Sequence, residues 1–256
     1  MFQRPRIVFP TTVIFAITVL LCIVNSSSKA NSQQLKAEDA EKFHSKIFSS
    51  NQIGTIAEHL AQTTGDITIT SNSDQEAGVS HDSNLPPYPP TRLVDLACFT
   101  DAVILATPVK GVSHMTADKS FVYSEWTMQV EEVLQNTPKA PISDGKQIVV
   151  VRPGGKLEIN GRMVYGIALD FPDFQPGGKY LLFLNYIPQT GDFKARSERT
   201  FNLLLDTLSA GKAHPYGDSH TADPVKSASA DELVRDARAA IASAAGMTAC
   251  KKEGNE

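Results

Sequence analysis

Apolar side chains occupy every second position over several stretches in the middle of the chain. In residues 121–133, Trp126 and Met128 fall on one face of an extended backbone and Tyr123 falls on the other. Successive side chains of a β-strand point to opposite faces, so a period of two predicts strands. Segments that also read as strands lie at residues 102–106, 146–151, 156–159, 162–168, 179–186, 193–196 and 201–205.

The turns between these segments have characteristic compositions. Asn160-Gly161 separates two predicted strands, and both residues tolerate the positive φ that a tight hairpin requires. Gly154-Gly155 and Gly177-Gly178 also lie between strands rather than before a helix. We therefore interpret both glycine pairs as turns and not as phosphate-binding loops.

Strands joined by short turns, without intervening helices, predict a mainly β fold with a small antiparallel barrel. A β-sandwich is the alternative. The barrel is preferred because a closed sheet leaves no exposed edge. We place this β-barrel domain at residues 91–210.

The C-terminal region, residues 211–256, is predicted to contain a loop over 211–223, a helix and a polar tail. Ser229 and Glu232 have the spacing of a capping box, which marks the start of a helix. One face of this helix is apolar and is formed by Leu233, Val234, Ala237, Ala240 and Ile241. We expect that face to pack on the barrel.

Upstream of the barrel, residues 31–64 are predicted to be a helical N-terminal region. Apolar residues recur there at spacings of three and four, which predicts two short amphipathic helices broken near residues 49–51. Residues 65–90 are dominated by Thr, Ser, Asn and Asp and end in a proline-rich run. That composition predicts a disordered linker.

Residues 1–30 have the order of a secretory signal peptide. Arg4 and Arg6 precede an apolar run, and small residues end at Ala30, where cleavage would occur. We therefore expect an exported protein, in the periplasm or outside the cell. The alternative is an uncleaved anchor in the inner membrane formed by residues 7–24, a length near the lower limit for crossing a bilayer. Only that alternative predicts membrane contact.

Charge limits the kinds of partner. The formal net charge of the 256 residues is -4, and removing residues 1–30 would remove three of the 24 basic residues and none of the 28 acidic ones. The mature chain would then carry about -7. Such a balance argues against nucleic acid and anionic lipid, so a protein, peptide or glycan fits better as a partner.

Two cysteines, Cys98 and Cys250, remain after removal of the leader. An oxidising compartment permits a disulfide between them, which would tie the start of the barrel to the end of the C-terminal helix. The alternative is two unpaired thiols. A metal site is disfavoured, because no histidine lies at ligand spacing beside either cysteine.

Five short segments carry a resemblance to a known group of proteins. They are residues 93–97, 101–107, 130–134, Pro153-Gly154-Gly155 and 176–184. They are similar to uncharacterised exported bacterial proteins with an OB-like, distantly netrin-like β-barrel domain. The resemblance covers residues 92–205, implies an OB-like barrel and carries no activity with it. Cys98-Phe99-Thr100 and the helical N-terminal region depart from the pattern of that group.

Motifs of enzymes are scarce in the sequence. There is no Gly-x-Ser-x-Gly, no Walker loop, no dinucleotide fingerprint and no His-Glu-x-x-His, so we expect no cofactor. Glu131 and Glu132 alternate across a predicted strand and cannot share a proton. The alternative to a non-enzymatic protein is a metal-assisted hydrolase that uses the loop from His214 to Asp223, with His214, Asp218 and His220 as ligands.

The preferred hypothesis is a binding or interaction module without catalytic activity. OB-type barrels often bind through one sheet face and its loops. We expect loops 111–120 and 170–178 to contribute, with Phe171 and Phe174 partly exposed and Tyr123 as a further candidate. A membrane-anchored structural protein of the envelope is another alternative, and it requires the uncleaved anchor.

Overall fold

The computed structural model describes residues 38–48, 53–71, 93–168, 171, 173–195, 200–203, 214–216, 229–247 and 250. The predicted leader and most of the predicted linker lie outside these residues. No helix in this part of the chain has the length and hydropathy needed to cross a membrane. Residues 1–41 and 42–256 form separate units. Residues 38–41 of the first unit are helical, and every described strand belongs to the second unit.

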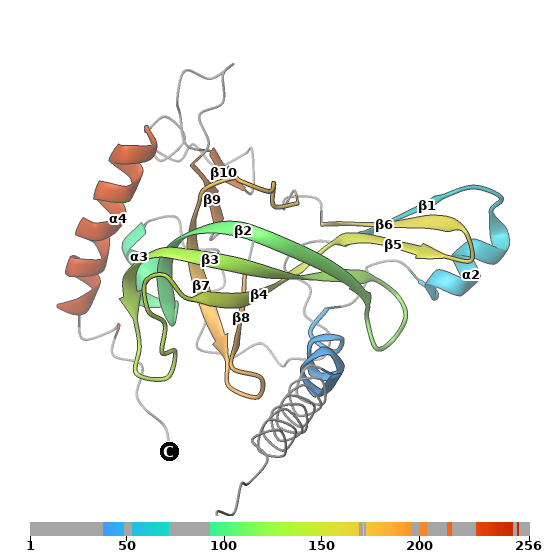
Figure 1. Cartoon of the computed structure of the whole chain (residues 1–256), viewed down its shortest axis with the longest axis horizontal. Helices are drawn as coiled ribbons and strands as arrows, with labels where there is room; N and C mark the ends of the chain where they lie inside the picture. The colour runs from blue at the N-terminus through green and yellow to red at the C-terminus, as the bar shows by residue number, and fades with distance from the viewer. Residues whose placement is uncertain are drawn as a thin grey trace, which may run out of the picture. The chain divides into compact units, whose positions relative to one another are not determined.

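Five strands close into a ring (Figure 1). They are β2 (Ala102–Met115), β3 (Val122–Asn136), β4 (Gln147–Pro153), β7 (Tyr180–Ile187) and β8 (Asp192–Lys194). β2, β3 and β4 pair antiparallel in sequence order, and β7 returns antiparallel to β2. β8 completes the ring by pairing with β7 and with β4. The prediction of a mainly β fold with a closed sheet is confirmed, but the β4–β8 pair is parallel.

The inside of the ring is apolar because each strand contributes the side chains of one face. Ile104, Met128, Val150, Leu182 and Phe193 are all buried there. Burying side chains of this size stabilises a fold by about 1.5 to 3 kcal/mol each. The period of two in the sequence therefore arises because every second side chain faces this interior.

The outer face of β2 and β7 is also buried. Helices α3 (Leu93–Cys98) and α4 (Ala230–Ala245) cover it, and Val103, Leu181 and Phe183 pack against Leu233 and Ala237. Burial on both faces explains why residues 102–106 and 181–184 are continuously apolar.

The C-terminal helix follows its prediction. The capping box of Ser229 and Glu232 is formed, and α4 packs through its apolar face. A disulfide between Cys98 and Cys250 joins the end of α3 to the segment after α4.

A second sheet of three strands consists of β1 (Ile67–Ser71), β6 (Arg162–Ala168) and β5 (Gly155–Ile159). The predicted hairpin turn at residues 160–161 is confirmed, with φ of 53° and 74°. Between β4 and β5, Gly154 and Gly155 have φ of 89° and 149°, a backbone conformation that side chains disfavour. These glycines let the chain pass from the ring into the second sheet.

Residue 65 is not the boundary of a linker, so that part of the prediction is wrong. Ile67–Ser71 forms strand β1, which pairs parallel with β6. Ile67 and Ile69 are buried in a cluster with Val122 and Val164. The prediction relied on the hydroxyl-rich composition, but isoleucine and threonine alternate in this segment, and both residue types are favourable in strands.

Two further expectations about loops are wrong. Residues 111–115 belong to β2, so the connection to β3 is shorter than the predicted loop over 111–120. Residues 214–216 form β10 (His214–Tyr216) inside the predicted loop 211–223, paired with β9 (Thr200–Asn202). Pro215 is tolerated there because β10 pairs on one side only in the described sheet.

The N-terminal region contains the two predicted helical segments. Residues 38–44 are helical, and α2 (Ile56–Gln62) begins with a capping box between Thr55 and Glu58. Ile56 is buried against the second sheet and the start of β3. Residues 42–71 are therefore part of the same unit as the ring.

Glu131 and Glu132 point to different partners, as the alternation along β3 predicts. The Lys179 ammonium lies 2.5 Å from Glu131, and the Thr107 hydroxyl donates a hydrogen bond of 2.6 Å to it. Arg238 of α4 pairs with Glu132 at 2.7 Å. The hydrogen bonds from Lys179 and Thr107 lower the pKa of the Glu131 carboxyl below its ordinary 4.5, more than burial raises it.

Stability is expected to depend on the protonation of Glu131. Its contribution is complete above the ordinary glutamate pKa and is lost as the pH falls through the lower pKa of the folded state. Glu131→Gln should therefore destabilise the protein at about pH 7 and have a smaller effect near pH 3. Urea denaturation at both pH values measures this difference. Glu158→Gln, at an exposed position of β5, is the control and should show no comparable change between them.

Candidate binding pocket

The aromatic residues predicted to bind are buried. Phe171 and Phe174 are each 1% exposed, and Tyr123 is fully buried. The expectation that Phe171 and Phe174 are partly exposed is wrong. Both belong to the apolar cluster inside the ring, where Phe174 contacts Tyr180 at 4.9 Å between ring centroids. The proline- and aspartate-rich composition of this loop suggested exposure, but its aromatic rings fill the interior instead.

A buried arginine accompanies these rings. The guanidinium of Arg152 lies 4.3 Å from the centroid of Phe171 and 5.7 Å from that of Phe174. It also pairs with the Asp173 carboxylate and donates to the Phe171 carbonyl. A guanidinium can stack on aromatic faces while its N–H groups bond to oxygen. Arg152 therefore holds Phe171, Asp173 and Phe174 in place, and these three residues have a structural role.

The proposed metal ligands are not tested by the structure. His214 lies on β10, whereas Asp218 and His220 lie outside the described residues. Within the described ranges, no group of three or more His, Cys, Asp or Glu residues could hold a metal ion. A metal site in the 214–223 loop stays a prediction from the sequence.

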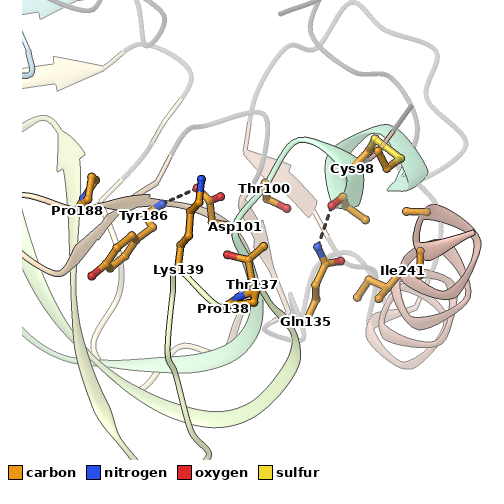
Figure 2. A pocket seen from close by; sticks show the side chains of 14 residues that line it. Cys98, Thr100, Asp101, Gln135, Thr137, Pro138, Lys139, Tyr186, Pro188 and Ile241 are labelled. Carbon is orange, nitrogen blue, oxygen red and sulfur yellow. Dashed lines mark hydrogen bonds between the residues drawn. A yellow bond between two sulfur atoms is a disulfide. The ribbon is translucent and has the colours of Figure 1, made fainter. Parts of the chain in front are cut away.

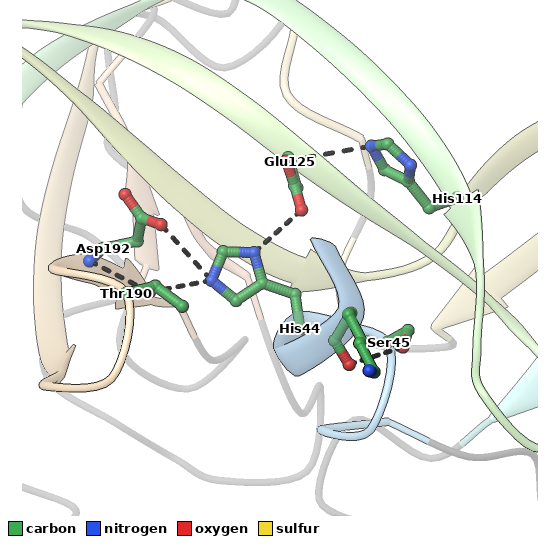
Figure 3. Close-up of polar contacts among 7 residues, drawn as sticks. His44, Ser45, His114, Glu125, Thr190 and Asp192 are labelled. Carbon is green, nitrogen blue, oxygen red and sulfur yellow. Dashed lines mark hydrogen bonds and ion pairs between the residues drawn. The ribbon is translucent and has the colours of Figure 1, made fainter. Parts of the chain in front are cut away.

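A histidine cluster joins the N-terminal segment to the ring, as Figure 3 shows. The fully buried His44 has its Nδ1 2.8 Å from a Glu125 oxygen. Its Nε2 lies 3.0 Å from the Thr190 hydroxyl and 3.4 Å from Asp192. The other Glu125 oxygen lies 3.8 Å from His114. Because the His44 ring has no exposed surface, it cannot meet a substrate, and the cluster anchors the segment to β3 and the β7–β8 turn.

A pocket of about 930 Å³ lies between the ring and α4, and we call it the α4 pocket. Four parts of the chain build it: the end of α3, the connection after β3, the end of β7 and the C-terminal half of α4. Figure 2 shows the pocket residues in a row, from Pro188 and Tyr186 at one end to Ile241 and the disulfide at the other. Among the described residues, the lining consists of Ala97, Cys98, Thr100, Asp101, Gln135, Thr137, Pro138, Lys139, Tyr186, Pro188, Ile241, Ala244, Ala245 and Cys250.

Several polar side chains of the lining hold the walls in position. Asp101 accepts a hydrogen bond of 2.9 Å from the backbone N–H of Tyr186. The side chain of Gln135 donates to the Ala97 carbonyl at 3.0 Å, and the Thr100 hydroxyl donates to the Leu96 carbonyl at 2.9 Å. Together with the disulfide, these bonds connect α3, β3 and β7 around the pocket. The pocket is therefore formed before any ligand enters.

Two other polar side chains of the lining, those of Thr137 and Lys139, make no such bonds to the described parts of the walls. The hydroxyl oxygen of Thr137 is buried and has no hydrogen-bond partner among the described residues. An unsatisfied buried hydroxyl costs about 1 to 3 kcal/mol, so a bound partner would stabilise it. Lys139 is exposed, and its ammonium forms no ion pair within the described part of the chain. Both groups lie on the connection between β3 and β4.

Sequence reasoning did not find the α4 pocket, because its walls are up to about 150 residues apart in the chain. The one available signal was the predicted Cys98–Cys250 disulfide, which brings the end of α4 to the start of the ring. The chain matches no protein-family model, and no curated protein matches it.

Proposed function

We propose that this protein is a non-enzymatic binding module that holds a small, largely apolar molecule in the α4 pocket. The observation that carries the proposal is the pocket itself, whose volume of about 930 Å³ falls in the usual range for ligand sites. Its walls are mainly apolar, with a few polar groups. This is the composition expected of a small-molecule site.

We further propose that the ring is an OB-like barrel. In support, the ring has five strands, and their order around it places the last strand between the third and the fourth. This is a Greek-key arrangement, which is the topology of OB barrels. Strands β5 and β6 of the second sheet are then an insertion between the third and fourth strands of the ring, and β1, which precedes the first ring strand, pairs with β6. The resemblance to exported OB-like proteins agrees with this interpretation.

Export remains part of the proposal. The leader in residues 1–30 supports it, and so does the disulfide, since such bonds persist in oxidising compartments. The ligand is then a molecule met outside the cytoplasm.

The proposal can be tested with a larger side chain on α4 that fills part of the pocket. Ala245 is exposed and lines the pocket, so Ala245→Phe should occupy part of its volume. Binding is measured by the fluorescence of N-phenyl-1-naphthylamine, an uncharged dye that brightens in apolar sites. We expect dye affinity to fall by about tenfold, equivalent to about 1.4 kcal/mol.

Ala242→Phe is the matched control, because Ala242 is exposed on the same helix outside the pocket lining. It should bind the dye as the parent protein does. Equal binding by both variants, or no binding by the parent protein, would contradict the proposed function. Unchanged circular dichroism shows that each variant is folded.

A further inference from the structure

We infer that the ligand of the α4 pocket is an amphiphile with a carboxylate group, bound by Lys139 and Thr137. This inference rests on the proposed function, and it adds the chemical class of the ligand. Among the described residues, the lining of the α4 pocket contains two charged side chains, Asp101 and Lys139. Their different surroundings indicate the charge of the ligand.

Asp101 already has a structural role. Its carboxylate accepts the Tyr186 N–H, and its backbone groups bond to Leu184 and Thr137. The carboxylate oxygen that accepts this N–H already has a hydrogen-bond partner within the fold. Asp101 is therefore a poor receptor for a ligand cation.

Lys139, in contrast, has no such partner in the part of the fold that the structure describes. It forms no ion pair within the described residues, and it lies two positions from Thr137 on the same connection. In Figure 2, both side chains lie in the middle of the row of pocket residues, between Tyr186 and Ile241. An ammonium and a hydroxyl can both donate hydrogen bonds to one carboxylate. Such a ligand would also give the buried Thr137 oxygen the partner that it lacks.

The remainder of the pocket suits a hydrocarbon chain. Ile241, Ala244, Ala245 and the disulfide form an apolar wall from the end of α4, and Pro138 and Pro188 add further apolar surface. None of these groups can bond to a polar ligand atom through its side chain. An aliphatic chain attached to the carboxylate would lie along this wall and leave water, which is favourable.

The experiment compares three competitors of equal chain length against the bound dye: decanoate, decanol and decylamine. Decanoate should displace the dye at an about tenfold lower concentration than decanol, equivalent to about 1.4 kcal/mol. Decylamine should be the weakest. Lys139→Met should remove the preference for decanoate over decanol. Thr137→Val should weaken decanoate by about threefold or more.

Lys156→Met is the control, because Lys156 is exposed on β5 outside the pocket lining. It should retain the preference for decanoate. Equal displacement by all three competitors, or strongest displacement by decylamine, overturns the inference while the proposed function stands. Failure of the parent protein to bind even the dye overturns both.

Discussion

Replacing Cys98 and Cys250 with serine is expected to lower the free energy of unfolding by about 4 to 5 kcal/mol. The two residues are 152 positions apart in sequence and are joined in the fold. A bond between such distant residues removes many conformations from the unfolded chain, and the chain-entropy model gives this magnitude. It is a large part of the roughly 5 to 15 kcal/mol that stabilises a typical domain.

Urea denaturation followed by circular dichroism measures this loss. Helix α4 should remain formed in the serine variant, because its capping box and its apolar contacts with Leu181 and Phe183 do not depend on the disulfide. The parent protein treated with a reductant is the control and should lose a similar amount. A loss below about 1 kcal/mol would show that the bond contributes little to holding the fold.

Truncation of Phe174 is expected to cost about 3 to 5 kcal/mol, the usual range for a buried phenylalanine changed to alanine. Phe174 contacts Trp126 at 5.6 Å and Phe171 at 5.7 Å between ring centroids, and its ring lies beside the Arg152 guanidinium. Phe174→Ala would therefore open a cavity in the ring and remove part of the surroundings of a buried charge.

Tyr165→Ala provides the comparison for Phe174→Ala. Tyr165 is an aromatic residue on β6 that is 39% exposed, so its loss should cost less than about 1 kcal/mol. Thermal denaturation of both variants measures the difference. Similar small losses at the two positions would mean that Phe174 is a surface residue, as its loop composition first suggested, and would restore it as a candidate for binding.

Much of the fold could be predicted because individual strands, turns and helix ends have sequence patterns of a few residues. The alternation in residues 121–133 predicts β3, Asn160-Gly161 predicts the β5–β6 turn, and Ser229 with Glu232 predicts the start of α4. Each of these signals acts over a few residues. The pairing of Cys98 with Cys250 could be proposed only because no other cysteine lies outside the predicted leader.

The rest could not be predicted because it depends on contacts between distant residues. Tyr123 faces away from the ring interior, and its burial depends on the rings of Phe48 and His114, which lie 6.1 Å and 5.3 Å from it between centroids. His44 is a polar residue on a short helix, and its burial requires Glu125 and Thr190 from distant parts of the chain. The α4 pocket likewise exists only where four distant segments meet. Local sequence patterns contain no information about such long-range contacts.

The parallel pairing of β1 with β6 has a consequence for shortened forms of this protein. A chain starting after residue 72 would leave the main-chain N–H and C=O groups along one side of β6 without their β1 partners. Tyr165 and Ile167 on that strand are already partly open to solvent. An uncovered strand of this kind invites pairing with another molecule and aggregation. Strand β1 thus protects solubility, so a shortened form of the chain should retain it.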